Sequence, residues 1–287
     1  MSNIPPVPPP PPTPPMKVTP GTPATTKERP AADHIPTDKC SWAAEYPEVQ
    51  KGCYLSRVCE DAPPKHCQYY SVNSIMQVGP TCGLVALSML LGGSPTAADL
   101  LKDAIEQEYT LNGELFSAQY LFELTRKHMP GPAACQLHAG PLDCKKVRAL
   151  LSAGGCLLVP YDSDVNHAPC VRHGHRAHWA LIVGYLVDRL DRFFVLARHG
   201  KSRNLAVWLL DTLSESNEHL KEFAQPKGYP DDEFLLPPGG IGGSLGLNER
   251  CILVNGLPKQ EDERIQHKHR HTWVQGISTK NVFHMGS

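Results

Sequence analysis

One cysteine, Cys82, lies in the stretch QVGPTCGLVAL (77–87), between a Pro-Thr turn and a run of apolar, helix-forming residues. A cysteine in the first turn of a helix meets backbone amides that lower the pKa of its thiol and can stabilise an oxyanion beside it. Gln77, on the incoming loop, can donate a further hydrogen bond to that oxyanion, and Gly83 leaves room for a substrate backbone. The stretch is therefore compatible with a nucleophilic thiol, but taken alone a cysteine before LVAL is more often packed in a core.

His178 is the candidate base for this thiol. It begins HWALIVGYLV (178–187), the most strand-like segment of the chain, and Trp179 follows it. Thiol peptidases take their base from a strand far downstream of the cysteine, and a histidine at the edge of an apolar strand can face a cleft while the strand anchors it. The order of the two residues, across a change from helices to strands, predicts that they work together.

The loop before His178 offers a competing chemistry. Five potential zinc ligands fall between 167 and 178, namely His167, Cys170, His173, His175 and His178. Their spacings match neither an H-E-x-x-H helix nor paired C-x-x-C knuckles, and the Gly, Pro and Arg residues among them are typical of a mobile loop over a cleft. We therefore expect a substrate-contacting loop without a metal, and a zinc-dependent hydrolase remains the alternative.

The other cysteine and histidine groups give weaker signals. Cys40, Cys53, Cys59 and Cys67 have no C-x2-C spacing, so structural zinc is not the favoured interpretation there. The HKHRH cluster (267–271) is more typical of a solvated tail than of a metal site. No cofactor is expected.

Composition narrows the function classes. The chain has 287 residues with 28 Lys plus Arg and 29 Asp plus Glu, so it lacks the basic field that holds nucleic acid or an acidic membrane surface. Its longest apolar runs are too short to cross a bilayer, and its beginning has no apolar signal segment. We expect a cytoplasmic protein whose ten cysteines stay reduced.

Residues 1–38 are low in complexity and contain PPVPPPPPTPP (5–15). Proline fixes φ and donates no hydrogen bond, which predicts extended polyproline II. The segment is either a spacer or a docking strip for an aromatic-lined groove of the kind found in profilin, SH3 or WW domains. The candidate docking residues are Pro8, Pro9, Pro10, Pro11 and Pro12.

The pattern of elements predicts an α+β domain, with an N-terminal helical half packed on a C-terminal, largely antiparallel sheet. Ser94 or Thr96 can cap one of the helices. Helices are expected over 81–93, 94–109, 114–129 and 141–155, and strands over 156–162, 178–187, 192–200, 205–210 and 250–256. The expected organisation is a disordered proline-rich segment (1–38), a connecting segment (39–70), a peptidase domain (71–256) and a polar tail that can be disordered (257–287).

GPTCGLVAL (79–87) followed by HWALIVGY (178–185) resembles the papain-like superfamily, in particular the C39-like cysteine peptidases. Over about 70–255 the chain is more closely similar to a family of actin-processing aminopeptidases, which also have a proline-rich N-terminus. The segments that carry this resemblance are GELFS (113–117), PYDSDVNHAPCVRHGHRAHWA (160–180), GKSRNLAVW (200–208) and SESN (214–217).

The resemblance implies a papain-like fold and a role for each matching residue. Cys82 would attack the scissile carbonyl, His178 would take its proton and later protonate the leaving amine, and Gln77 would bind the oxyanion. Gly83 and Trp179 would contact substrate. The implied substrate is immature actin, which would lose its acetylated first residue (Met, or the residue exposed after it). Profilin, bound by the proline segment, would bring profilin-bound actin to the site.

The chain departs from the C39-like pattern at one position. These peptidases orient the histidine with an Asp at the end of the next strand, where this chain has Arg198 or His199, and Asp188 and Asp191 come too early. The third catalytic member is therefore left open, with Asp162, Asp164 and Asn166 as candidates. A catalytically inactive adaptor that binds actin and profilin is the non-enzymatic alternative.

Overall fold

The computed structural model describes residues 35–36, 38–129, 131, 134–225, 228–229, 231 and 233–258, together with the backbone of 270–274. The proline run and most of the expected polar tail lie outside the described residues. Within the described part, no helix has the length and apolar character that crossing a bilayer requires.

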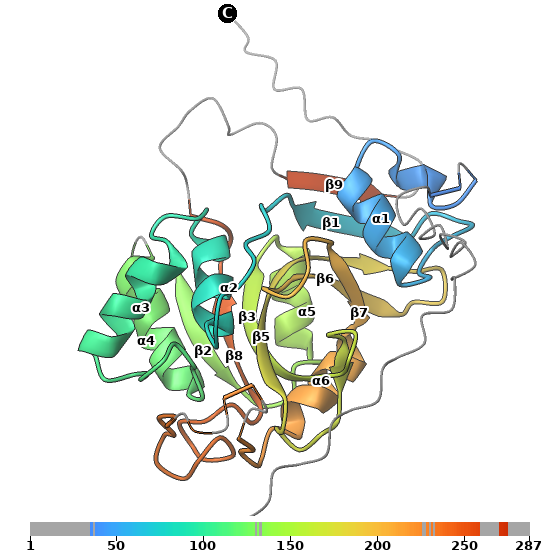
Figure 1. Ribbon diagram of the computed structural model, residues 1–287. Helices are drawn as coiled ribbons and strands as arrows, with labels where there is room; N and C mark the ends of the chain where they lie inside the picture. The colour runs from blue at the N-terminus through green and yellow to red at the C-terminus, as the bar shows by residue number, and fades with distance from the viewer. Residues whose placement is uncertain are drawn as a thin grey trace, which may run out of the picture. The chain divides into compact units, whose positions relative to one another are not determined.

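The described strands form one sheet in which every pairing is antiparallel. The main path runs β2-β8-β3-β5-β1-β9, while β4 pairs with β3, and β6 joins β5 to β7 (Figure 1). The strands are β1 (His66–Tyr70), β2 (Cys135–Ala139), β3 (Cys156–Ser163), β4 (Pro169–Cys170), β5 (Ala177–Val187), β6 (Phe193–Arg198), β7 (Ala206–Leu209), β8 (Arg250–Val254) and β9 (Arg270–Val274).

Strand β5 is the centre of this sheet. Its first half pairs with β3, its last residues pair with β1, and β6 runs along its other edge with a register shift between Ile182 and Gly184. A Cβ at Gly184 would lie 2.2 Å from the carbonyl oxygen of Gln68 on β1. Because only glycine allows this approach, β1 can continue the sheet where β3 stops.

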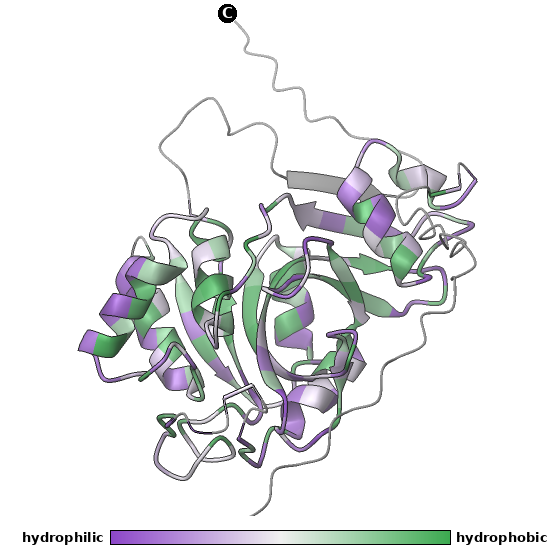
Figure 2. Ribbon diagram, viewed as in Figure 1, coloured by the Kyte–Doolittle hydropathy of each residue, from purple (hydrophilic) through white to green (hydrophobic). Residues whose placement is uncertain are grey.

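Helices cover both faces of the sheet. They are α1 (Pro47–Leu55), α2 (Cys82–Leu90), α3 (Ala97–Glu106), α4 (Ala118–His128), α5 (Lys145–Ser152) and α6 (Leu210–Glu218). Buried residues of α1 to α4 share one core cluster, and those of α5 and α6 share the other. Successive residues of β5 alternate between the clusters, with Trp179 and Leu181 in the first and Ala180 and Ile182 in the second. The central strands are accordingly apolar over most of their length (Figure 2).

The predicted α+β class with an antiparallel sheet is confirmed. The four expected helices correspond to α2 through α5, and the five expected strands to β3 and β5 through β8. Thr96 caps α3: its hydroxyl accepts a hydrogen bond from the Asp99 backbone amide, and the Asp99 carboxylate accepts one from the Thr96 backbone amide. The expected connecting segment, 39–70, contains a 3₁₀ turn (Ser41–Ala43), α1 and β1, which is a strand of the sheet.

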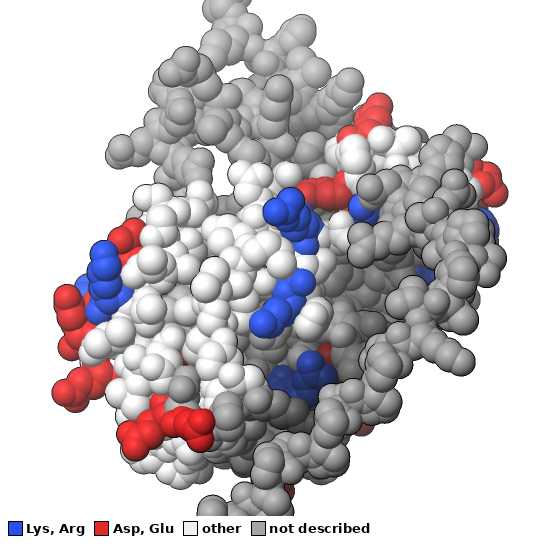
Figure 3. All heavy atoms as spheres, in the orientation of Figure 1, with Lys and Arg blue, Asp and Glu red and all other residues white. Residues whose placement is uncertain are grey.

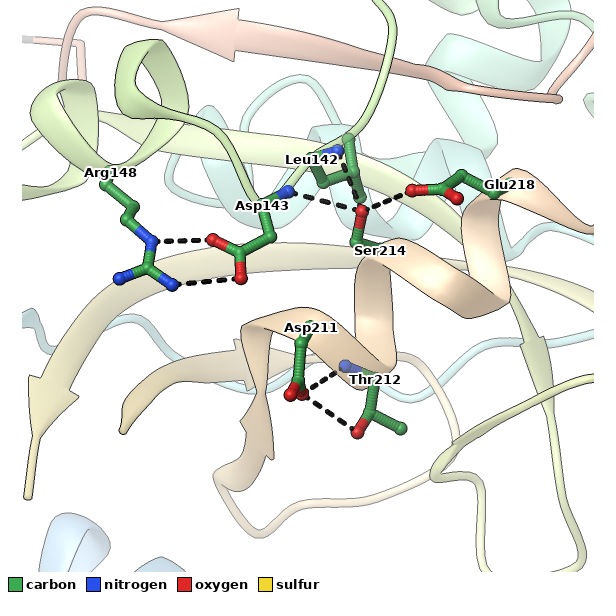
Figure 4. A network of polar contacts seen from close by, with 7 residues as sticks. All are labelled: Leu142, Asp143, Arg148, Asp211, Thr212, Ser214 and Glu218. Carbon is green, nitrogen blue, oxygen red and sulfur yellow. Dashed lines mark hydrogen bonds and ion pairs between the residues drawn. The ribbon is translucent and has the colours of Figure 1, made fainter. Parts of the chain in front are cut away.

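Helix α6 is held against the loop before α5 by a polar network (Figure 4). The Ser214 hydroxyl accepts hydrogen bonds from the amides of Leu142 (3.0 Å) and Asp143 (3.2 Å) and donates one to Glu218 (2.8 Å). Asp143 in turn forms a two-pronged ion pair with Arg148 of α5. This anchoring fixes the face of α6 that touches β3.

Candidate active site

Cys82 is the first residue of α2. The preceding Thr81 turns the chain into the helix, with its hydroxyl donating a hydrogen bond to the carbonyl of Val78 at 2.8 Å. The thiol is half-buried and lies beside backbone amides of its own helix turn and of β5, among them those of Gly83 and Trp179. The structure therefore brings the thiol against the strand that carries His178, beside the residue that follows it.

The pKa of the Cys82 thiol is raised above its ordinary value because the atoms packed around the sulfur remove it from water. The amides of Trp179 and Gly83 and the charge of Lys201 act in the opposite direction, without offsetting the burial. The sequence predicts the lowering influence of the helix amides but not the larger effect of desolvation. In the structure the thiol is protonated at neutral pH.

His178 is buried near the start of β5 and pairs across the sheet with Tyr161. Their rings meet edge to face at 5.7 Å between centroids. Burial lowers the pKa of His178 well below its ordinary value, and the nearby charges of His199 and Lys201 lower it further. The imidazole is therefore neutral at neutral pH, which is the state that can accept a proton. Its Nε2 atom is buried without a hydrogen-bond partner among the described residues.

Two further histidines surround His178. The His199 ring lies 5.9 Å from that of His178, and the His167 ring lies 6.5 Å from it and 5.8 Å from His199. His199 follows β6, stacks on Trp208 at 5.7 Å, and accepts a hydrogen bond on Nδ1 from the Lys201 amide at 3.4 Å. Burial lowers the pKa of His199 to about 4, so its ring is also neutral. His178 is thus surrounded by aromatic and imidazole rings, at the place where the C39-like pattern has a carboxylate that orients the histidine.

Gln77 lies on the loop that enters α2. Its backbone amide donates a hydrogen bond to the Gly200 carbonyl at 2.9 Å. This bond ties the loop to the connection between β6 and β7. The side-chain Nε2 donates to the Gly79 carbonyl at 2.8 Å, while Oε1 is buried without a partner among the described residues. Because an amide nitrogen carries two hydrogens, one N–H remains for a further acceptor.

Gly83 and Trp179 pack against each other in the core beneath Cys82. A Cβ at Gly83 would lie 3.1 Å from Leu115 and 3.2 Å from the Trp179 ring. The Trp179 indole donates to the Leu115 carbonyl at 2.8 Å, and its side chain is only 2% exposed. Both residues are therefore placed to support the first turn of α2, and the space expected beside Gly83 is filled by protein.

The acidic candidates for orienting His178 are engaged elsewhere. The buried Asp162 carboxylate accepts hydrogen bonds from the amides of Arg172 (2.9 Å), Gly174 (2.6 Å) and Arg176 (2.9 Å). Asp162 thus holds the loop that leads to His178, and none of these three hydrogen bonds involves the imidazole. The hydroxyl of Ser216 on α6 donates a hydrogen bond to the Cys170 carbonyl at 2.7 Å, which is a second contact that holds the same loop.

The remaining candidates form local contacts. Asp164 accepts from the amides of Asn166 and Ala168, and the Asn166 side chain is exposed. Asp188 and Asp191 lie in the turn after β5, where Asp188 pairs with Arg192 and Asp191 with Lys65. Arg198, at the end of β6, forms an ion pair with Glu48 of α1.

The competing metal interpretation gains no ligand set from the described residues, in which no three His, Cys, Asp or Glu side chains are arranged to hold an ion. The histidines of the loop point to different neighbours. His173 approaches the rings of His175 and His219, whereas His167 belongs to the surround of His178.

Several residues near the site carry no local signal in the sequence. Tyr161 contacts the His178 ring and donates a hydrogen bond to the His167 carbonyl at 2.9 Å, but in the sequence it is one aromatic residue in an apolar strand. Asn217 of α6 donates to the carbonyls of Pro160 and Arg250, so it ties β3 to β8. The available signals for these contacts are two segments that carry the resemblance: 160–180, which includes Pro160 and Tyr161, and SESN (214–217), which includes Asn217.

The geometry defines the class of this chain: an α+β protein with a thiol at a helix N-terminus, set against a strand that carries a buried neutral imidazole. Residues 72–186 match the family described as actin maturation protease-like, C-terminal domain. The chain is 88% identical over 260 residues to the actin maturation protease of Drosophila melanogaster, covering 91% of this chain and 97% of that protein. It is 31% identical over 230 residues to the actin maturation protease of Danio rerio, covering 66% of this chain and 74% of that protein. The chain belongs to the actin maturation protease family.

Proposed function

We propose that this chain is a cytoplasmic cysteine aminopeptidase with a papain-like fold, which removes the acetylated N-terminal residue from immature actin. The names of its relatives support actin as the substrate. The observation that carries the chemistry is the position of the Cys82 thiol at the start of α2, beside the backbone amide of Trp179, which is the residue that follows His178.

The protonation states suggest how the thiol is activated. Since burial keeps Cys82 protonated and His178 neutral, His178 accepts the thiol proton as the sulfur attacks the scissile carbonyl. The oxyanion receives hydrogen bonds from amides at the start of α2 and from the free N–H of Gln77. The imidazolium then protonates the leaving amine, and actin departs without its first residue.

The second half of the cycle restores the enzyme. The acetylated residue remains bound to Cys82 as a thioester, and His178 takes a proton from a water molecule that attacks this thioester. The free acetyl-amino acid leaves, and the proton returns to the sulfur. An acetylated terminus has no ammonium group, so the site requires neither a carboxylate nor a metal to hold one.

Mass spectrometry of the actin N-terminus tests the proposal. Immature acetylated actin incubated with the purified protein should lose one acetylated residue, with the acetyl-amino acid released in equal amount, in the presence or absence of a chelator. An unchanged terminus would contradict the peptidase function and favour the adaptor. Activity that is lost to the chelator and restored by zinc would favour a metal-dependent hydrolase.

A further inference from the structure

Two basic residues flank the candidate site from different elements. Lys201 lies in the connection between β6 and β7, directly after Gly200, whose carbonyl accepts the Gln77 amide at 2.9 Å. Arg176 lies two residues before His178, where its amide donates to Asp162 at 2.9 Å. Both side chains are exposed. Their backbones are therefore fixed at the site while their charged ends remain available.

Neither cation has a carboxylate partner among the described residues, whereas several other basic side chains do. Lys127 and Arg192, for example, form ion pairs of 2.5 Å and 2.7 Å with Asp103 and Asp188. Figure 3 shows Lys and Arg atoms gathered in the middle of the face that carries α2 and the β6–β7 connection, while Asp and Glu atoms lie mainly towards its edges.

The positive charges of Lys201 and Arg176 affect the pKa values of groups at the candidate site. Lys201 contributes to lowering the pKa of Cys82, and Lys201 and Arg176 both contribute to lowering the pKa of His178 and of His167. The two side chains therefore produce a positive electrostatic potential over the site. Among the described residues, no acidic side chain forms an ion pair with either of them. Such a potential attracts an anionic group of a substrate.

We propose that Lys201 and Arg176 form a subsite for carboxylate side chains of the polypeptide substrate, on the leaving-group side of the cleaved bond. The proposal rests on the proposed aminopeptidase function, because removal of a single acetylated residue leaves every other substrate residue on that side. A substrate whose second and third residues are acidic would place its carboxylates near the two cations. An acetylated terminus carries no positive charge of its own to oppose this attraction.

Three acetylated peptides test the subsite, identical except that the second and third residues are both Asp, both Asn or both Lys. The wild-type protein should cleave them with kcat/KM in the order Asp, Asn, Lys, and added salt should reduce the preference for Asp. Neutralising both cations, in Lys201→Gln/Arg176→Gln, should lower kcat/KM for the Asp peptide about ten-fold and bring it to the level of the Asn peptide. Cleavage of the Asn peptide should stay within about two-fold of wild type.

A matched control neutralises two exposed lysines of α5, Lys145→Gln/Lys146→Gln, and should leave the preference for Asp intact. Equal cleavage of the Asp and Asn peptides by wild type would overturn the subsite, as would an equal loss on both peptides in the double variant. If peptides are too short to be cut, the same Asp and Asn pairs are placed in intact actin. Failure of wild type to cleave any acetylated substrate would instead overturn the proposed function, and the subsite with it.

Discussion

Cys82 and His178, the residues proposed to react, have pKa values that burial moves in opposite directions. The thiol pKa rises above its ordinary value and the imidazole pKa falls well below 6.5. The proposed resting state at neutral pH is therefore a neutral thiol and a neutral imidazole, in place of the thiolate and imidazolium that a lowered thiol pKa would give. In the proposed mechanism, the thiol is activated only as its proton moves to His178.

This arrangement predicts the pH dependence of kcat/KM. The base must be neutral, and because its pKa is lowered, the acid limb of the profile should lie below pH 6.5. An unperturbed imidazole would lose about three quarters of its neutral form at pH 6, whereas this protein should keep most of its activity there. Circular dichroism at each pH controls for unfolding. An acid limb centred at or above pH 6.5 would contradict the buried, neutral His178.

At the residue scale, sequence spacing could suggest the pair that is proposed to react but not the surroundings of that pair. Cys82 and Gln77 are adjacent to one helix start, and His178 begins an evident strand, so local patterns were sufficient for them. The neighbours of His178 come from β3, from the loop before β4 and from the end of β6. Which rings meet there depends on the sheet register, which no local pattern encodes.

At the element scale, Asp162 links β3 to the loop that leads to His178. Its fully buried carboxylate accepts three backbone amides of residues 172–176. Asp162→Asn turns an amide N–H toward those donors and should lower the free energy of unfolding by about 2–4 kcal/mol. Because the same loop positions His178, kcat/KM should fall by about ten-fold or more even where the variant is folded.

Urea unfolding and kcat/KM measure the two effects separately. Asp143→Asn is the matched control, since Asp143 pairs with Arg148 at the surface and its loss should cost no more than about 1 kcal/mol. If Asp162→Asn were as stable as the wild type, the loop would not depend on this carboxylate.

The elements that sequence patterns missed share a physical reason. β1 (HCQYY) and β2 (CQLHA) are short and mix polar with apolar residues, and α6 (LDTLSESNE) has few apolar positions. Each is stabilised by contacts far along the chain, such as β1 with β5, β2 with β8, and Ser214 with the loop before α5. The strongly periodic segments, by contrast, carry their own hydrophobic pattern and could be placed from the sequence.

At the scale of the whole molecule, the proline-rich segment is proposed to recruit profilin-bound actin. Tethering raises the effective concentration of substrate at the site without any new contact to actin. Replacing Pro8 through Pro12 with a Gly-Ser linker of equal length should lower the cleavage rate on profilin-bound actin by about ten-fold or more, at substrate concentrations below KM. The rate on free actin should be unchanged.

Cleavage rates on free and on profilin-bound actin, measured side by side, separate recruitment from other effects. An equal loss on both substrates would point to a defect in the peptidase itself. No loss on either would identify the segment as a spacer.

The most direct test of the central claim is the mass of the actin N-terminus after incubation with three forms of the protein: wild type, Cys82→Ala and Cys144→Ala. Cys144 is a matched control because it is also half-buried beside a helix start, and its side chain makes no capping hydrogen bond. Wild type and Cys144→Ala should both remove the acetylated residue, while Cys82→Ala should bind actin and leave its terminus intact. Removal of the residue by Cys82→Ala at the wild-type rate would contradict the proposed thiol mechanism.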